Sequence, residues 1–398
     1  MTTLAEPRAK GRDDRPRTAI GRLADGRFFF AILIALRIIM LLSTIRAIQL
    51  NPDRLDDARR LQQIATTDGR PWRDVEVEYA PVEVVLVRLV AGSTTVDTGI
   101  RLALLAFLGD VVTFAILRRV WGHRAGIRYL ALGTPLLPLI YYHFDPIPTA
   151  MAVGAVALAS RGRERIGGTT LALAMLAKVW AVVLAPMWVL ERRRSALAWF
   201  LGFAAIGGLS WIAYGGTGAP GQVATFRHAT GWHVASVVGD VVWLLTGGPA
   251  FVHSGTIRVG SVPGWAPALL IACGLALIVL IWRRARDWPG PPAGAPALAA
   301  VTALCLVSPL FSVQYVWWLL PFAAVATLGP RGRVFGGLTA AASVLSIAIA
   351  YALVFGEPHV AGTAATVGRW LVLARNISCV AIVASFIWYA RRETGARS

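Results

Sequence analysis

The sequence predicts an all-α fold, a polytopic integral membrane protein with about twelve transmembrane helices, and three observations support this class. The 398 residues are 56% hydrophobic and only 15% charged, whereas soluble domains carry about 25% charged residues. The mean hydropathy is +0.62. The basic residues stand in short clusters between apolar segments, which is the pattern of cytoplasmic loops. The net charge of +18 therefore does not indicate a nucleic-acid-binding face.

The transmembrane helices are predicted from apolar runs, since a span needs about 20 apolar residues and fewer inside a bundle. The fifth and sixth are the two arms of residues 167–190, which turn near Lys178. A further piece near Val237–Leu245 is apolar but ambiguous. The other predicted spans are Phe28–Ile48, Val96–Leu117, Tyr129–Tyr142, Thr149–Ala159, Ala196–Tyr214, Ala266–Ile281, Ala295–Val307, Tyr315–Leu328, Val334–Val354 and Trp370–Ala390.

The chain is predicted to have one membrane domain, residues 28–390, between two polar ends. Residues 1–27 are basic, and we expect a disordered cytoplasmic leader. The apolar run that follows is too long for a signal-peptide core, so it is interpreted as a retained helix, with a transit-like leader as the alternative. Residues 391–398 form a cytoplasmic tail.

The arginine clusters decide the predicted orientation, because positive charges stay on the cytoplasmic side. With both termini in the cytoplasm of a plasma-membrane protein, every cluster falls inside: Arg118/Arg119, Arg161–Arg165, Arg192–Arg194, Arg283–Arg286, Arg331/Arg333 and Arg391/Arg392. Five histidines fall outside: His143, His228, His233, His253 and His359. Asp110 lies toward the cytoplasmic half of its span, and we expect it to pair with Arg101 or a backbone hydroxyl.

The first outer loop, residues 51–95, is the strongest functional signal. Residues 50–82 hold seven of the 21 acidic residues, and long loops in compact proteins tend to be functional. The loop ends in a short apolar segment, Tyr79–Val90, interrupted by Glu83 and Arg88. This composition suits a helix lying along the membrane surface. The loop is therefore predicted to be catalytic.

Polar residues from separate loops meet at the same outer level in this topology. They are Asp56, Asp57, Glu78, His143, Asp145, Lys178, His233 and Gln314. No metal-binding cluster has convincing spacing; a divalent ion at the aspartate pair is possible in principle but is not supported. No glycine-rich nucleotide motif is present in the sequence.

The order of these motifs resembles the GT-C superfamily of polyprenyl-phosphate-sugar-dependent glycosyltransferases. It is most similar to the actinobacterial α-mannosyltransferases of glycosyltransferase family 87, which include phosphatidylinositol-mannoside mannosyltransferases. The resemblance covers about Ala31 to Pro321. Its motifs are the aspartate pair Asp56-Asp57, the segment Glu78-Tyr79-Ala80-Pro81, Asp145-Pro146, Lys178 at a helical turn, and the late run from Ser308 to Pro321.

The resemblance implies that an aspartate of the first outer loop is the general base. A carboxylate there removes the proton of the acceptor hydroxyl as it attacks the anomeric carbon. Asp57 fits the family pattern best and Asp56 is the alternative. A third reading is that both aspartates cap a loop helix. The family's aromatic position is occupied by Leu61, and its Tyr-Pro-Pro appears as Tyr79-Ala80-Pro81, so the acceptor and the sugar can differ.

The substrate-binding residues implied by the resemblance include Glu78 and Tyr79. Lys178 is a candidate contact for the phosphate leaving group; alternatively it extends to the membrane surface. Asp145 orients a substrate hydroxyl, pairs with an arginine, or only forms a turn.

Three later residues complete the predicted substrate contacts. His233 contacts phosphate or acceptor, or is a surface-loop histidine. Gln314 and Tyr315 stand where the phosphatidylinositol-mannoside enzymes have paired histidines. They can hydrogen-bond a sugar, but they argue against the same acceptor.

The predicted function is that of an inverting membrane glycosyltransferase, with no required cofactor. It transfers a hexose, in the first place mannose, from polyprenyl phosphate to a glycolipid or polysaccharide on the outer face. The alternatives are a polyprenyl-phosphate-arabinose transferase, a lipid or sugar transporter or flippase, and a non-catalytic assembly protein. A transporter is expected to have inverted repeats and polar residues near the midplane, and neither is evident here.

Overall fold

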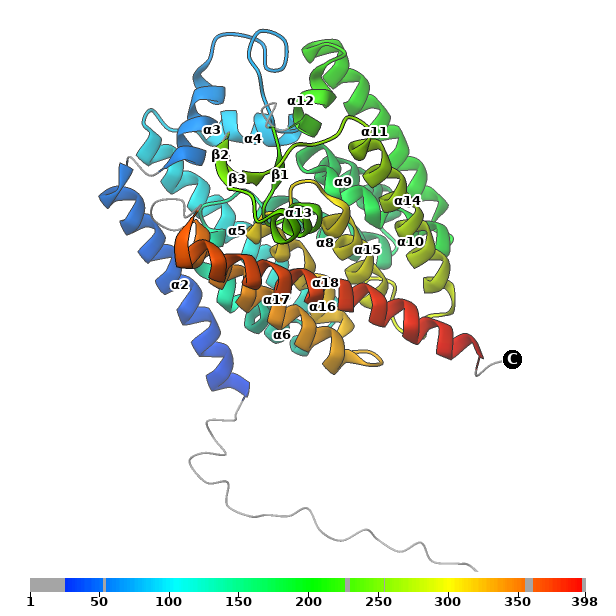
Figure 1. Ribbon diagram of the computed structural model, residues 1–398. Coiled ribbons are helices and arrows are strands. Elements are labelled where there is room, and N and C mark those ends of the chain that lie inside the picture. The colour runs from blue at the N-terminus through cyan, green and yellow to red at the C-terminus, as the bar shows by residue number, and fades with distance from the viewer. Residues whose placement is uncertain (1–25, 53–54, 226–229, 254, 355–360, 396–398) are drawn as a thin grey trace, which may run out of the picture.

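The computed structural model describes residues 26–52, 55–225, 230–253, 255–354 and 361–395, and these residues are mostly helical (Figure 1). The predicted leader falls almost wholly outside the described residues, as do His228 and His359, whereas residues 391–395 of the predicted tail are the end of a helix. Within the described ranges, six helices are long and apolar enough to span a membrane: Phe28–Leu50 within α2 (Gly26–Leu50), α5 (Thr95–Val120), α11 (Arg194–Gly215), Ala266–Asp287 from α14 (Ala266–Arg284) through η4 (Ala285–Asp287), α17 (Gly332–Leu353), and Gly362–Arg392 within α18 (Gly362–Gly395). The helical membrane fold is confirmed, and the count of twelve spans stays a prediction.

The remaining predicted spans are shorter helical pieces. They are α6 (His123–Gly133), η2 (Thr134–Leu136), α7 (Leu137–Ile140), α8 (Pro146–Ser160), α9 (Glu164–Ala177), η3 (Val179–Leu184), α10 (Pro186–Leu190), α15 (Ala295–Val307), η5 (Val313–Leu319) and α16 (Leu320–Ala326).

Prolines explain several of these breaks, because proline removes a helical N–H donor and clashes with the preceding turn. Pro135 and Pro138 interrupt the predicted span Tyr129–Tyr142, which is a chain of α6, η2 and α7 rather than one helix. Pro186 and Pro321 stand where η3 and η5 give way to α-helix. Irregular backbone at membrane depth is tolerated where protein surrounds it, and Trp180, Leu184 and Leu319 are accordingly buried.

A cap of short elements covers one end of the bundle (Figure 1). It contains α3 (Asp56–Thr66), α4 (Pro81–Val90), α12 (Ala219–Thr225) and α13 (Val237–Thr246). It also contains a three-stranded antiparallel sheet in the order β1 (Trp232–His233), β3 (Thr256–Val259), β2 (Phe251–His253). The all-α prediction missed this sheet, because its strands are only two to four residues long. The ambiguous piece near Val237–Leu245 is α13.

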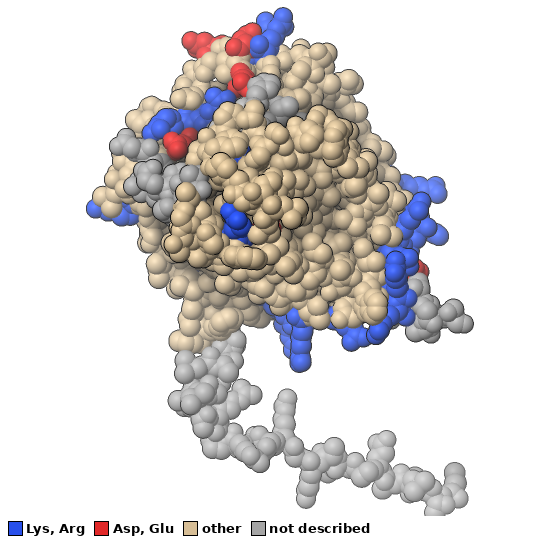
Figure 2. All heavy atoms as spheres, in the orientation of Figure 1, with Lys and Arg blue, Asp and Glu red and all other residues tan. Residues whose placement is uncertain are grey.

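The charged side chains separate between the two ends of the molecule (Figure 2). Most acidic side chains visible in this view gather at the end that carries α3 and the cap, where Asp56, Asp68, Asp74 and Glu76 are exposed. Most basic side chains line the opposite end and one edge. The arginine clusters predict a separation of this kind, and the orientation in the membrane stays a prediction.

A close helix contact fixes the position of α8, which carries Asp145 just before its first residue. A Cβ added to Gly109 of α5 would lie 2.7 Å from the carbonyl oxygen of Pro146. Such a distance is too short for any side chain, so glycine is required at this crossing. The start of α8 is thereby held against α5, below α3.

Candidate active site

Lys178 lies at a break between two helical segments. Helix α9 ends at Ala177, Lys178 itself is extended with φ −151° and ψ 116°, and η3 begins at Val179. A helix break therefore lies at the residue where the sequence predicted a turn, and the two separate spans stay a prediction. Its Nζ lies 3.1 Å from Oδ1 of Asp145. The Lys178 side chain does not simply extend to the membrane surface, because its ammonium forms an ion pair inside the protein.

Asp145 stands at the N-cap position of α8 but does not cap the helix with its side chain. It is 1% exposed, and its Oδ1 also accepts a hydrogen bond of 2.6 Å from Nε1 of Trp318. A buried carboxylate requires such partners. Its partner is thus a lysine and an indole rather than the arginine that the sequence suggested.

Aromatic rings surround this ion pair. Trp318 stacks on Tyr315 with centroids 4.0 Å apart and on Trp180 with centroids 5.3 Å apart. The Lys178 ammonium lies 5.8 Å from the centroids of both Tyr315 and Trp318, within cation–π range. The structure therefore brings Tyr315, Lys178 and Asp145 together, as the sequence predicted. Gln314 is half-buried, and its Oε1 accepts a hydrogen bond from Ser312.

The aspartate pair begins α3, and the two side chains differ in their surroundings. The N-cap residue is Leu55, without a side-chain cap bond, so the capping interpretation is wrong. Asp56 is 88% exposed and forms an ion pair with Arg59 at 3.1 Å. Asp57 is 52% exposed, and its Oδ2 lies 3.4 Å from Nδ1 of His143, which is two residues before Asp145. Only Asp57 faces the residues that precede α8.

Glu83 is a buried carboxyl group that the sequence interpretation treated only as an interruption of an apolar segment. It lies in the first turn of α4 and is 2% exposed. Burial raises its pKa to about 8; Lys178 opposes the rise, and Asp145, Asp57 and Glu78 add to it. Glu83 therefore shares the electrostatic environment of the Lys178–Asp145 pair. A carboxylate in an apolar run is a functional hypothesis by default, and that signal could have found it.

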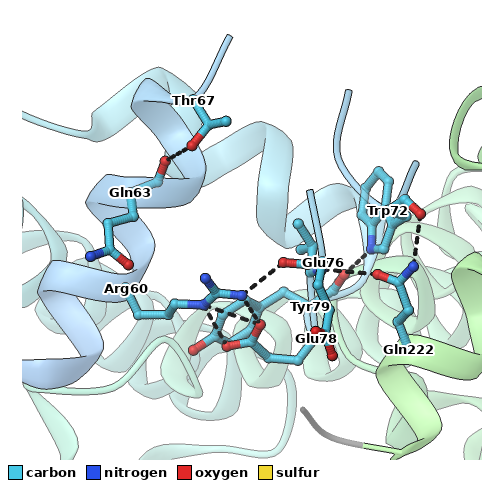
Figure 3. Close-up of polar contacts among 9 residues, drawn as sticks. Arg60, Gln63, Thr67, Trp72, Glu76, Glu78, Tyr79 and Gln222 are labelled. Carbon is cyan, nitrogen blue, oxygen red and sulfur yellow. Dashed lines mark hydrogen bonds and ion pairs between the residues drawn. The ribbon is translucent and has the colours of Figure 1, made fainter. Parts of the chain in front are cut away.

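The loop that joins α3 to α4 is tied down by Arg60 (Figure 3). Its guanidinium donates to both oxygens of Glu78, the shortest contact being 2.8 Å, and to the carbonyl oxygen of Glu76 at 2.7 Å. The carbonyl oxygen of Tyr79 accepts a hydrogen bond of 3.0 Å from Trp72. Glu78 is buried and bound to an arginine that the sequence interpretation missed.

Gln222 of α12 holds the same loop from its other side (Figure 3). Its Oε1 accepts a hydrogen bond of 2.9 Å from the backbone N–H of Val77, and its Nε2 donates one of 2.7 Å to the carbonyl oxygen of Trp72. The segment before α4 is thus fixed between α3 and α12, which in turn fixes Glu78 and Tyr79.

His233 is buried in β1, so the surface-loop interpretation is wrong. Burial lowers its pKa to about 3, with Arg258 and Arg375 adding to the effect, and the imidazole is therefore neutral at pH 7. Its electrostatic interactions are with these two arginines and not with Lys178. His233 belongs to a separate group of residues.

Asp110 is paired differently from the prediction. Its Oδ2 accepts hydrogen bonds of 2.9 Å from Nε of Arg37 in α2 and from the hydroxyl of Tyr141. Arg101 instead donates to the carbonyl oxygen of Ala91. The partner on another helix was not visible in the local sequence. Asp110 is thus structural, as expected, although through other residues.

The site therefore contains a carboxylate open to solvent, a buried ion pair, a buried carboxyl group with a raised pKa, and stacked aromatic rings. Among the residues that the structure describes, no three His, Cys, Asp or Glu side chains are grouped as metal ligands. This arrangement can accept a proton at Asp57 and present a positive charge at Lys178, which suits group transfer with an anionic leaving group.

Comparison with known proteins gives one family match. The model of glycosyltransferase family 87 matches residues 79–309. The match includes Tyr79, Glu83, Asp145, Lys178 and His233 and begins after the aspartate pair. No match is found among curated proteins.

Proposed function

Because this chain belongs to glycosyltransferase family 87, we propose that it is an inverting, polyprenyl-phosphate-sugar-dependent transferase. It moves a hexose, in the first place mannose, from a β-linked polyprenyl phosphate to a hydroxyl of a glycolipid or polysaccharide. The reaction takes place on the outer face of the plasma membrane and gives an α-linkage. The observation that carries this proposal is the position of Asp57 opposite His143, next to the Lys178–Asp145 pair.

Asp57 is the proposed general base. The acceptor oxygen attacks the anomeric carbon from the face opposite the phosphate, and its proton passes to the Asp57 carboxylate. The bond between the anomeric carbon and the phosphate oxygen breaks, and the electron pair leaves with the phosphate. Partial exposure of Asp57 lets an acceptor hydroxyl approach it. His143 beside it holds the carboxylate in orientation.

Lys178 is the proposed electrostatic partner of the leaving phosphate, whose negative charge grows in the transition state. Asp145 and Trp318 hold the lysine side chain in place. Glu83 has a pKa of about 8 and is protonated at lower pH. In that form it is a hydrogen-bond donor toward a sugar or phosphate oxygen. Tyr79, Gln314 and Tyr315 are the proposed sugar contacts, and Glu78 shapes the loop before α4.

The proposed topology has twelve spans and both termini in the cytoplasm. The separation of acidic and basic side chains between the two ends supports it (Figure 2), because basic residues remain on the cytoplasmic side. Helix α4, with Val85 and Leu89 exposed, forms one wall of the groove that takes the polyprenyl tail.

The test is sugar transfer in membranes from a host that lacks the protein. Membranes with and without the chain receive labelled polyprenyl-phosphate-mannose and a crude glycolipid extract, and the product is digested with α- and β-mannosidases. We expect label transfer only with the chain, and an α-linked product. Transfer from a polyprenyl-phosphate pentose alone would replace the hexose in this proposal, and transfer from neither donor by inserted protein would overturn it.

A further inference from the structure

A second group of charged residues lies between the sheet and α18, separate from the Lys178–Asp145 pair. His233 of β1 and Arg258 of β3 are directly opposite in the antiparallel register, so their Cβ atoms are about 5 Å apart on one face of the sheet. Arg375 of α18 joins them by donating to the carbonyl oxygens of Ala235 and Phe311. The three side chains are 8%, 5% and 0% exposed, respectively.

The two guanidiniums are buried without a direct carboxylate partner among the described residues. Within the part of the chain that the structure describes, Arg258 donates to neutral oxygens, namely Oγ1 of Thr256 at 2.8 Å and the carbonyl oxygen of Gly231 at 2.9 Å. Arg375 donates to two carbonyl oxygens and, at 2.9 Å, to Oδ1 of Asn376. A buried arginine is ordinarily paired, and an unpaired buried charge is strongly unfavourable.

Asp240 is a carboxylate beside this group, and it does not balance the charge. It accepts a hydrogen bond of 3.0 Å from Asn376 and lies in the field of Arg369 as well as Arg375. Among the described residues, one carboxylate thus stands against three guanidiniums, and the hydrogen bonds link Asp240 to Arg375 through Asn376. Burial without a counter-charge also lowers the pKa of Arg258.

Two buried nitrogen atoms in the same group, one on a guanidinium and one on the neutral imidazole, have no partner among the described residues. Nδ1 of His233 and Nε of Arg375 are buried and have no hydrogen-bond partner in the part of the chain described. Buried polar atoms are nearly always hydrogen-bonded, and the exceptions call for an unseen ion or ligand. Nε of Arg375 is a donor, and Nδ1 of His233 donates in the tautomer that carries the proton there. Both nitrogens, beside uncompensated positive charge, are thus complementary to an oxyanion.

We propose that Arg258, Arg375 and His233 form a second anion-binding site, which takes the phosphate group of a lipid substrate. Arginine suits this role because its planar fork of N–H groups matches phosphate oxygens. The phosphate belongs either to the polyprenyl carrier or to an acceptor phospholipid. The lipid class rests on the proposed transferase function, whereas binding itself requires no turnover.

The experiment is thermal unfolding of the full chain in nanodiscs of neutral phosphatidylcholine, with each of three probes added. The probes are farnesyl phosphate, phosphatidylinositol and inorganic phosphate. We expect a lipid phosphate to raise the Tm of the wild type, and Arg258→Gln and Arg375→Gln to need at least tenfold more probe for the same rise. Arg283→Gln, at an exposed arginine, is the matched control and keeps the wild-type response.

Which probe acts identifies the source of the phosphate. A response to farnesyl phosphate assigns the site to the carrier, and a response to phosphatidylinositol assigns it to an acceptor. A response to inorganic phosphate alone overturns a lipid site. Loss of the response in Lys178→Gln, with the Arg258 and Arg375 variants responding like the wild type, also overturns the proposal.

A purely structural role for the arginines predicts a different result. The Gln variants would then lower the Tm without probe and leave the probe-induced rise unchanged. In our proposal the Gln variants lose the probe-induced rise itself, whatever their Tm without probe. Arg258→Lys and Arg375→Lys keep the charge, and we expect them to retain part of the response. Folded Lys and Gln variants that all respond like the wild type would contradict the site.

Discussion

The carboxylate of Asp145 and the ammonium of Lys178 lie 3.1 Å apart, and Trp318 donates to the same carboxylate oxygen. The two charged residues come from the start of α8 and from the break after α9. The packing of α8 against α9 therefore determines where the Lys178 ammonium lies in the site.

Lys178→Met should leave Asp145 buried without its cation. Removing one partner of a buried pair costs about 3–5 kcal/mol, so the Tm of the variant should fall by several degrees. The double variant Lys178→Met with Asp145→Asn should recover much of this stability but not the transfer rate. Thermal unfolding in detergent and the transfer assay measure the two effects. A single variant as stable as wild type would show that the pair is not formed.

The protonation of Glu83 should control activity near pH 8. Its pKa is raised from 4.5 to about 8, mainly by burial, in the presence of Lys178, Asp145, Asp57 and Glu78. If the protonated form is the active one, the transfer rate should fall as the pH rises through about 8. Glu83→Gln cannot ionise and should lose this alkaline limb. An unchanged pH–rate profile in the variant would argue against a role for Glu83.

The ionisation of the Glu83 carboxyl group also makes the stability of the fold depend on pH. Because the pKa is higher in the folded than in the unfolded state, folding binds a proton between pH 4.5 and about 8. Stability is therefore lost as the pH rises through this range. Glu83→Gln should be stabilised relative to wild type at pH 9 more than at pH 5, as measured by Tm. The opposite trend would mean that the carboxyl group is ionised in the fold.

Arg60→Met should loosen the loop before α4, because it leaves Glu78 buried without its donor. We expect a lower Tm and lower transfer activity. The double variant Arg60→Met with Glu78→Gln should lose less stability than the sum of the losses of the two single variants. Arg59→Met is the control, since its pair with Asp56 is exposed and such pairs contribute about 0–1 kcal/mol. Equal effects of the two arginine changes would contradict the structural role of Arg60.

The sequence was sufficient for the elements that depend on local pattern. The prediction Ala295–Val307 coincides with α15, and Phe28–Ile48 and Val334–Val354 differ from α2 and α17 by about two residues at each end. Apolar length and proline position determine such boundaries locally. Lys178 at a helix break was found in the same way.

The misses depend on contacts between distant residues. Arg37 pairs with Asp110 across 73 positions and Arg60 reaches Glu78 across 18, and neither pairing follows from helical periodicity. The burial of Glu83 arises when α4 packs beside α3 and α9, although its place in an apolar run is itself a local signal. The group of Arg258, Arg375 and His233 needs both the short sheet and a helix more than 100 residues later.

The central claim is tested most directly by comparing Asp57→Asn with Asp56→Asn in the transfer assay. Both variants remove one charge from the same turn of α3, but only Asp57 faces His143, while Asp56 is 88% exposed. We expect Asp57→Asn to lose at least a hundredfold in transfer rate, within the usual range for a general base, and Asp56→Asn to stay within twofold of wild type. Full activity of folded Asp57→Asn would contradict the account.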